Sequence, residues 1–90
     1  MLDVYYTARF KKDFKRCEKQ GIDTAKVFGT IDDLRKRKTL SGRMCDHALS
    51  GNYSGARECH ILPDLLLIYR VDKERLVLTA VRLGSHSQLF

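Results

Sequence analysis

The apolar positions in the first part of the chain recur at helical spacing. Residues 2–6 form a short strand-like segment, and Thr7 after them can cap a helix N-terminus. The helix itself is predicted by apolar residues that recur every three or four positions, Phe10, Phe14 and Cys17. Gly21 stands where the end of a helix favours glycine. The pattern therefore predicts a strand followed by a helix that ends before Gly21.

A second helical pattern begins after Asp23, whose carboxylate can cap a helix. Its apolar residues are Val27, Phe28, Ile31 and Leu34. Gly29 weakens this helix by about 1 kcal/mol relative to alanine, and the cations at 35–38 favour its C-terminal end through the helix dipole. Two short helices joined by a tight turn are expected to form a helical hairpin.

The spacing changes to that of strands in the second half of the chain. Two loops, at 39–44 and 50–55, contain the turn-forming residues serine and glycine. Three strands are then predicted, at about 55–62, 65–71 and 75–83, joined by the short turns Pro63-Asp64 and Asp72-Lys73. The apolar run at 65–69 is typical of a central strand that is buried on both faces.

The predicted elements run in the order β-α-α-β-β-β. This order indicates an α+β fold in which a helical hairpin packs on one face of a small antiparallel sheet, followed by a short C-terminal tail. With 43% apolar residues, residues 1–90 are expected to form a single domain around one core. No apolar run is long enough for a membrane span, and the first residues lack the apolar segment of a secretory signal.

The net charge of +6 is distributed unevenly along the chain. Residues 1–43 hold 12 Lys/Arg and 6 Asp/Glu, whereas residues 44–90 hold 5 of each. A basic domain of this size suggests a polyanionic partner, either nucleic acid or an acidic protein. A solvated, Lys-rich helix surface explains the charge equally well. The basic positions on the predicted helices are Lys12, Arg16, Lys19, Arg35, Lys36, Arg37 and Lys38.

Candidate chemistry is concentrated in the second half, which holds all three histidines, His47, His60 and His86. Antiparallel pairing would bring His60, Asp64 and Arg82 to one edge of the sheet, and the tail would carry His86 over them. Groups that titrate near neutral pH beside a fixed cation suit acid–base chemistry on a phosphate ester. That chemistry is the functional hypothesis.

Strand alternation adds a prediction about which side chains share a face. Glu58 and His60 point to one side of their strand, while Arg57 and Cys59 point to the other. If Cys59 faces the helices, His60 lies on the open face of the sheet. A plainer interpretation treats Arg57 and Glu58 as paired sheet charges.

Plainer interpretations also exist for other candidate residues. Asp64 after Pro63 suits a turn, and Phe90 could plug the core with the chain end. The three cysteines lack the spacing of a disulfide framework and fit a reducing cytoplasm, where the chain is expected to act. No cysteine or histidine pair has zinc-ligand spacing, and no phosphate-binding glycine loop opens a helix, so we expect neither metal nor cofactor.

The second half of the chain resembles the YafQ branch of the RelE-type toxins of bacterial toxin–antitoxin pairs. The resemblance rests on the ordered motifs D-H-x-L, G-x-x-x-x-x-R-E-x-H, P-D and R-x-G-x-H-x-x-L-F within residues 46–90, and it is looser across the helices. It implies a ribonuclease that cuts messenger RNA in the ribosomal A site. It also implies a cognate antitoxin, small and acidic where it binds the toxin, that silences it in a hetero-oligomer.

The resemblance assigns roles to individual positions. The matching residues are the loop histidine His47, the central pair His60 and Asp64, the strand-end Arg82, the C-terminal His86 and the terminal aromatic Phe90. It implies metal-independent cleavage by the substrate's own 2′-OH, with His86 as general acid and Arg82 as phosphate stabiliser. The general base is His60 or Asp64, and His60 is favoured unless Asp64 is desolvated.

RNA contacts are expected from Arg57, from Phe90 and from the basic positions on the helices. Leu65 stands where some relatives have a bulky aromatic residue, which removes a possible stacking surface for a base. Two alternatives need none of the histidines. The chain could be a non-catalytic RNA- or ribosome-binding module, or an inactive toxin relative that acts through its protein partner.

Overall fold

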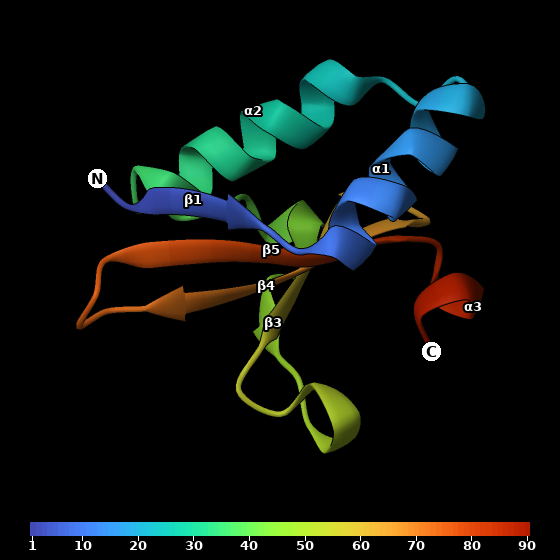
Figure 1. The fold of residues 1–90 in the computed structure, drawn as a ribbon. Helices are drawn as coiled ribbons and strands as arrows, with labels where there is room; N and C mark the ends of the chain where they lie inside the picture. Colours follow the sequence, from blue (N-terminus) through green and yellow to red (C-terminus); the bar gives the residue numbers. More distant parts are fainter.

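A helical hairpin covers one face of a twisted five-stranded sheet in the computed structural model, which describes residues 1–90 (Figure 1). The strands are β1 (Asp3–Tyr6), β2 (His47–Ala48), β3 (Arg57–Leu62), β4 (Leu65–Asp72) and β5 (Val77–Gly84). The helices are α1 (Ala8–Lys19), α2 (Thr24–Arg35) and the short α3 (His86–Leu89). Two 3-10 turns, Gly42–Met44 and Gly51–Tyr53, lie between α2 and β3. The predicted α+β fold is confirmed.

The sheet is mixed, which corrects the prediction that all its strands are antiparallel. Its order is β1-β5-β4-β3-β2, and β2 to β5 pair antiparallel. β1 instead pairs in parallel with β5, with Asp3 opposite Val77 and Tyr6 opposite Ala80. Apolar spacing shows which face a strand buries but carries no information on the direction of its neighbour. β2 is only two residues long and was too short to produce a pattern.

Side-chain caps begin both helices of the hairpin, as the sequence predicted. The Thr7 hydroxyl accepts a hydrogen bond from the Phe10 N–H at 3.0 Å, and the Asp23 carboxylate accepts one from the Ala25 N–H at 3.1 Å. Gly21 has a φ of 81°, so the chain turns between the helices in the left-handed region that glycine tolerates. None of the helices is long and apolar enough to cross a bilayer.

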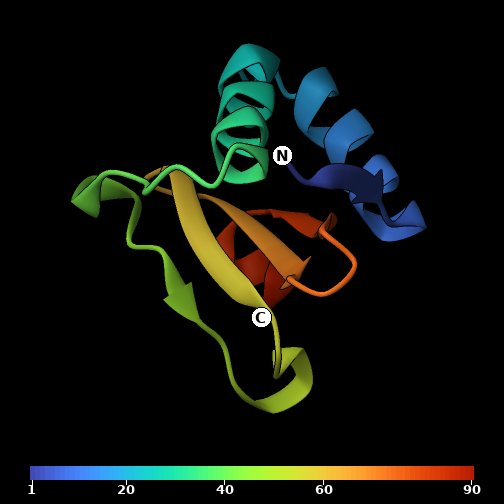
Figure 2. The same cartoon turned by 90° about the vertical axis from the view of Figure 1, so that its left-hand side faces the viewer.

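Apolar side chains are buried on both faces of the sheet. The larger cluster joins the hairpin to the sheet and includes Phe10, Cys17, Val27, Ile31, Cys59 and Leu67. The smaller cluster lies on the opposite face and contains Ala56, Leu66, Ile68 and Leu89. Figure 2 shows the hairpin above the sheet and the connection from β2 to β3 below it. β4 is thus buried on both faces, which confirms its prediction as the central strand.

Side chains of α1 cover the part of β5 that β1 does not reach. The Thr7 hydroxyl donates to the Val81 carbonyl at 2.7 Å, and the Asp13 carboxylate accepts from the Leu83 N–H at 3.0 Å. The Arg16 guanidinium donates to the Leu83 carbonyl at 2.9 Å. An uncovered strand edge would leave these backbone groups open to pairing with another chain. Polar residues of one helix therefore take the place of a neighbouring strand.

Candidate active site

The strand register arranges the candidate residues in two rows on the sheet face opposite the hairpin. One row crosses β2 to β5 and consists of His47, Glu58, Ile68 and Arg82. The next row consists of His60, Leu66 and Gly84. Ile68 and Leu66 belong to the smaller cluster, whereas Cys59 belongs to the cluster under the hairpin. Glu58 and His60 thus share the face that strand alternation predicted for them.

The C-terminal tail folds under the end of the sheet and brings His86 to Asp64. The Ser85 and Gln88 side chains close a capping box at the start of α3, and Leu89 is buried in the smaller cluster. The His86 N–H donates to the Asp64 carboxylate at 3.1 Å. The turn at Asp64 and the tail therefore meet, as expected, and they do so through the backbone of His86.

An aromatic surface forms around the end of the chain. The Phe90 ring is 55% exposed and lies 5.0 Å from the His86 ring and 5.5 Å from the Tyr53 ring, measured between centroids. The Tyr53 hydroxyl donates to the Leu89 carbonyl at 3.3 Å, which ties the second 3-10 turn to the tail. Phe90 therefore does not plug the core, and its ring is open to a base that could stack on it.

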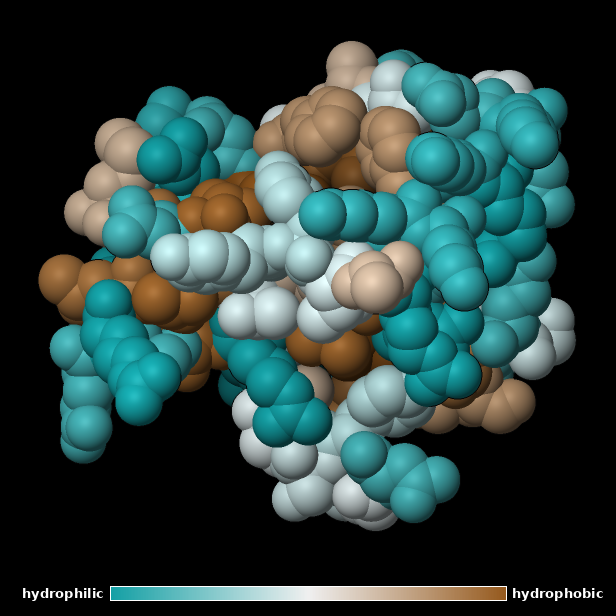
Figure 3. Space-filling model, viewed as in Figure 1, coloured by the Kyte–Doolittle hydropathy of each residue, from teal (hydrophilic) through white to brown (hydrophobic).

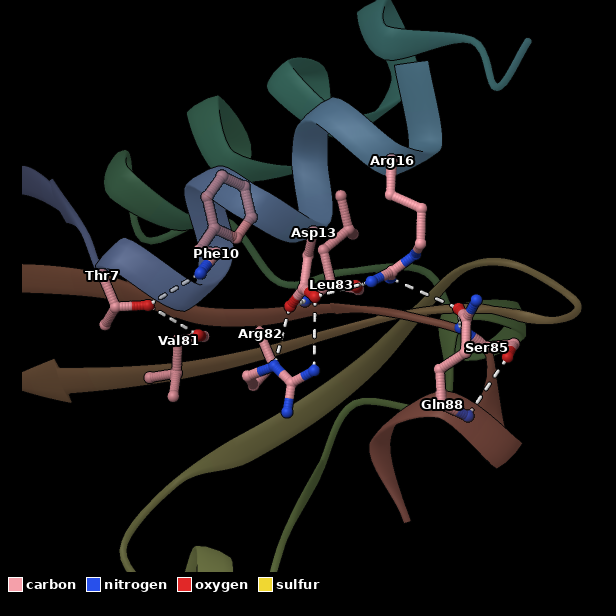
Figure 4. A network of polar contacts seen from close by, with 9 residues as sticks. All are labelled: Thr7, Phe10, Asp13, Arg16, Val81, Arg82, Leu83, Ser85 and Gln88. Atoms are coloured by element: carbon pink, nitrogen blue, oxygen red, sulfur yellow. Dashed lines mark hydrogen bonds and ion pairs between the residues drawn. The ribbon is translucent and has the colours of Figure 1, made fainter. Parts of the chain in front are cut away.

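Arg82 is held by a carboxylate of the hairpin (Figure 4). Its Nε donates to Asp13 Oδ2 at 2.7 Å and its Nη2 donates to Asp13 Oδ1 at 3.2 Å, while the side chain is only 14% exposed. The hydrogen bond to Asp13 raises the pKa of Arg82 above its ordinary value, and Tyr53 adds a smaller effect in the same direction. Arg82 therefore remains a fixed cation over the whole physiological pH range.

His47 lies at the other end of its row and forms a separate pair. Its Nε2 is 3.0 Å from Glu58 Oε2, and its Nδ1 is 2.6 Å from the Cys45 carbonyl oxygen. Both ring nitrogens thus lie within hydrogen-bond distance of an oxygen, which fixes the plane of the ring. Three strand spacings separate His47 from Arg82 in the row, a distance of about 14 Å. The structure does not bring His47 to the residues at the β5 end.

Two predicted RNA-binding cations form ion pairs with carboxylates of the same chain. Arg57 points to the hairpin side, away from His60, and its Nε donates to Asp46 at 3.1 Å, a carboxylate that also accepts from the Tyr69 hydroxyl at 2.5 Å. Arg16 was expected to contact RNA from the surface of its helix, yet it bonds Asp13 and the β5 backbone. The helical period alone placed Arg16 beside Lys12 and Lys19, which are exposed, and gave no sign of the neighbouring strand.

The basic run at 35–38 lies at the far end of the molecule from His86. The Arg35 carbonyl accepts from the Leu2 N–H at 2.8 Å, just before β1, and β1 pairs with the start of β5. His86 follows the other end of β5, about 25 Å away at the rise of a strand. Lys36 pairs with Asp32 at 2.9 Å and Lys38 with Asp33 at 3.8 Å, so acids of α2 neutralise part of the run.

Some residues at the site carried no recognisable signal in the sequence. Asp13 occupies a helical position between apolar residues, where a carboxylate is usually exposed, so only the three-dimensional contact with Arg82 reveals it. Tyr53 lies in a loop whose fold no periodicity indicates. His60 also lines an open groove between α2 and β3 together with Lys26 and Arg43, two cations that are not among the predicted site residues. No three His, Cys, Asp or Glu side chains are close enough together to hold a metal ion.

Comparison with known proteins identifies the family. The sequence of residues 2–90 matches the family model of YafQ, described as the bacterial toxin of type II toxin–antitoxin systems. The chain is 32% identical over 89 residues to the mRNA interferase toxin YafQ of Escherichia coli K12, which covers 98% of this chain and 95% of that protein. A metal-bound toxin from Helicobacter pylori is 40% identical, with a TM-score of 0.94 over 100% of both chains. A chain of the E. coli DinJ–YafQ complex is 31% identical, with a TM-score of 0.89 over 100% of this chain and 99% of that one.

The chain therefore belongs to the YafQ family of toxins of bacterial type II toxin–antitoxin systems. The resemblance noted in residues 46–90 thus extends over the helices as well. The E. coli relative is an mRNA interferase, a class of endoribonuclease, and full-length identity assigns this chain to the same class of enzyme.

Proposed function

We propose that this toxin cleaves messenger RNA in the A site of the translating ribosome, with the substrate's own 2′-OH as the nucleophile. The observation that supports the proposal is that His60 and Arg82 lie in neighbouring rows of one sheet face, two strands apart, at the end of the sheet where the His86 tail folds back to Asp64. A fixed cation and two imidazoles in this part of the molecule offer the base, the acid and the charge stabilisation that phosphoryl transfer requires. All of these groups are side chains, so the proposed reaction needs no metal.

In the proposed reaction, His60 takes the proton of the 2′-OH while the 2′ oxygen bonds to phosphorus. Arg82 stabilises the negative charge that develops on the non-bridging oxygens. His86 donates a proton to the 5′ oxygen as its bond to phosphorus breaks. The products are one RNA that ends in a 2′,3′-cyclic phosphate and one that begins with a 5′-hydroxyl.

His60 is a better candidate for the base than Asp64. The Asp64 carboxylate is exposed to water and already accepts a hydrogen bond from the backbone of His86. A carboxylate that is already engaged with the backbone of the tail is less free to take the proton of the 2′-OH. We therefore assign Asp64 to holding the tail, and we assign His47 to positioning the substrate at some distance from the reacting phosphate.

The proposal includes two partners. The exposed surface at the site is small, so a free RNA would rarely adopt the geometry for in-line attack, whereas the ribosome would hold the codon extended. The toxin would therefore act in the cytoplasm, where ribosomes translate. The relative in the DinJ–YafQ complex is bound by its antitoxin. We propose that a small antitoxin, acidic where it meets this chain of net charge +6, silences it in a hetero-oligomer.

The chemistry is tested by cleavage of a defined message in a purified translation system. Wild-type toxin is expected to produce fragments with 5′-hydroxyl ends. His86→Ala and Arg82→Ala are each expected to slow cleavage by at least about 100-fold while circular dichroism shows a folded domain. Ser87→Ala, next to His86 on the exposed side of α3, is the matched control and should cleave normally. Full cleavage by either test variant would reject the role of that residue.

Ribosome dependence is tested separately with the same message. Cleavage is expected while translation runs and is expected to be negligible when initiation is blocked. Equal cleavage under both conditions would reject the ribosomal site and leave the nuclease chemistry intact. Wild-type toxin that binds ribosomes without any cleavage would instead favour the non-catalytic binding module.

A further inference from the structure

Helix α1 buries a carboxylate against the end of the sheet that carries the proposed chemistry. Asp13 is 3% exposed and lies on the face of α1 that packs on the core. A charged group at such a position destabilises a fold unless hydrogen bonds pair it fully. Asp13 is paired by Arg82 and Leu83 of β5 and by Arg16 of its own helix. Its partners on the sheet are therefore Arg82 and the residue next to it.

The carboxylate fixes the plane of the Arg82 guanidinium. Arg82 uses Nε and Nη2 in a two-point contact with Asp13, at 2.7 and 3.2 Å (Figure 4). The Leu83 N–H donates to the same carboxylate at 3.0 Å, which locks the contact to the backbone of β5. The third nitrogen of Arg82, Nη1, takes no part in these bonds. A two-point contact of this kind leaves one orientation for the group, in which Nη1 is outside the pairing with Asp13 and Tyr53 is the other side chain that acts on the guanidinium.

The charge of the cluster stays positive although Arg82 is paired. Arg16 donates to Asp13 Oδ1 at 2.9 Å, so two guanidinium groups share one carboxylate. The sum of two positive charges and one negative charge is a net charge of +1. Asp13 can therefore orient Arg82 without cancelling the attraction of the site for a phosphate.

Arg16 links the same cluster to the tail that carries His86. Its Nη2 donates to the Leu83 carbonyl at 2.9 Å and to Gln88 Oε1 at 3.3 Å. Gln88 Oε1 also accepts from the Ser85 N–H at 2.9 Å, within the capping box of α3. Gly84 makes this link possible, because a Cβ at that position would lie 2.8 Å from Arg16 Nη2 and 2.9 Å from Gln88 Oε1. One helix thus holds both Arg82 and the start of α3.

We propose that Asp13 is a positioning residue for RNA cleavage, which aims the Arg82 guanidinium at the scissile phosphate, and that Arg16 extends this control to the His86 tail. The inference rests on the proposed function, because Arg82 and His86 are the groups that it positions. Asp13 touches no substrate and acts only through Arg82. Its removal should consequently slow the chemical step and leave ribosome binding unchanged.

The test compares single-turnover cleavage of ribosome-bound message by Asp13→Asn and by wild type. Asparagine keeps the shape of Asp13 but loses the charge and places a donor opposite the guanidinium. We expect the cleavage rate to fall by about 100-fold, the effect of misplacing a reacting group by about 1 Å, with the half-saturating ribosome concentration unchanged. Val27→Ala, which removes buried methyl groups from α2, is the control for destabilisation alone and should cleave normally.

A second comparison separates positioning from general damage to the fold. Arg82→Lys retains a cation that cannot make the two-point contact, so Asp13→Asn should change its cleavage rate by less than about 3-fold. Independent, multiplicative effects of the two substitutions would overturn the inference, as would a normal cleavage rate for Asp13→Asn. If circular dichroism shows that Asp13→Asn is unfolded, Asp13→Glu is tested in its place. Glutamate keeps the charge but displaces the carboxylate, so cleavage should slow by the same factor.

The same experiment distinguishes failure of the inference from failure of the proposed function. If Arg82→Ala cleaves normally, the proposed role of Arg82 is wrong and Asp13 has nothing to position. If Arg82→Ala is inactive and Asp13→Asn cleaves normally, only the positioning inference is wrong.

Discussion

The two buried carboxylates at the site differ in how completely they are paired. Asp13 accepts hydrogen bonds from two arginines and from a backbone N–H. Glu58, whose side chain is 5% exposed, uses Oε2 for His47, while its Oε1 has no partner. A buried acceptor without a partner destabilises a fold by about 1–3 kcal/mol. The orientation of Arg82 is therefore fixed by a fully paired carboxylate, whereas the carboxylate beside His47 keeps one unpaired oxygen, Glu58 Oε1.

Acid should release Arg82 from its partner. Burial by itself would raise the pKa of Asp13, but hydrogen bonds from Arg82, Leu83 and Arg16 outweigh it and hold the pKa below its ordinary value of 3.8. The unfolded chain has the ordinary value, so the contribution of this carboxylate to stability is complete well above pH 4. It is lost as the pH falls through the lower, folded-state value.

Urea unfolding measures this loss. The free energy of unfolding of wild type minus that of Asp13→Asn is expected to stay constant between about pH 7 and pH 5 and to shrink below about pH 4. Asp23→Asn, which alters an exposed helix cap, is the control for a carboxylate without buried partners. A difference between wild type and Asp13→Asn that is as large at pH 3 as at pH 7 would contradict the lowered pKa.

The element that depends most on a single contact is α3. It has only four residues, too few to be stable alone, and Leu89 anchors it in the smaller cluster. Leu89→Asp should undock the tail, remove His86 from Asp64 and lower the cleavage rate by at least about 10-fold. The cluster under the hairpin is untouched, so the free energy of unfolding should fall by only about 2 kcal/mol.

Cleavage assays and thermal melts check the role of α3, with Leu89→Met as the volume-matched control. The informative outcome is loss of activity with a cooperative melt retained. Normal cleavage by Leu89→Asp would show that His86 does not need the docked tail.

At the level of elements, the sequence was sufficient wherever local chemistry decides the outcome. The caps at Thr7 and Asp23, the turn at Gly21 and the central strand β4 were all predicted, because each follows from neighbouring residues. Strand alternation also placed His60 on the correct face. The parallel direction of β1 and the existence of β2 were missed, because pairing over long range leaves no local pattern.

The candidate site shows the same limit. His60, Asp64, Arg82 and His86 were predicted to meet at one edge of the sheet. The structure joins Asp64 to the backbone of His86, and the register places His60 and Arg82 on one face but two strands apart. The role of Asp13 could not be predicted, because it depends on a contact between residues 69 positions apart. The candidate residues could thus be named from the sequence, whereas the groups that hold them in place could not.

On the scale of the whole molecule, the basic surface and the proposed chemistry lie at different ends. The run at 35–38 is beside the start of β5, and His86 follows its end. Charges that far from the reacting phosphate cannot stabilise the transition state directly, because screening acts over about 8 Å at physiological salt. Their contribution to function is expected to be binding alone.

Neutralising the run tests this separation. Ribosome binding is measured at several salt concentrations, and the logarithm of the binding constant is plotted against the logarithm of the salt concentration. Substitution of Lys36, Arg37 and Lys38 by glutamine should make the slope of this plot shallower by about one to two. The single-turnover cleavage rate at saturating ribosomes should not change. Neutralising Lys73 and Arg75 at the turn between β4 and β5 is the matched control. An unchanged slope would mean that the run serves only the end of α2 and the solvated surface.

The pairing of β1 with β5 determines when the domain can fold during its synthesis. Asp3 lies opposite Val77, so the first strand cannot pair until the last strand, β5, has been synthesised. Asp13 likewise meets Arg82 only after β5 has formed. During synthesis, at roughly 5–20 residues per second, no shorter nascent chain can assemble the cleavage site. If the toxin cleaves message on translating ribosomes, as proposed, the ribosome that makes it is safe from it until the last strand has emerged.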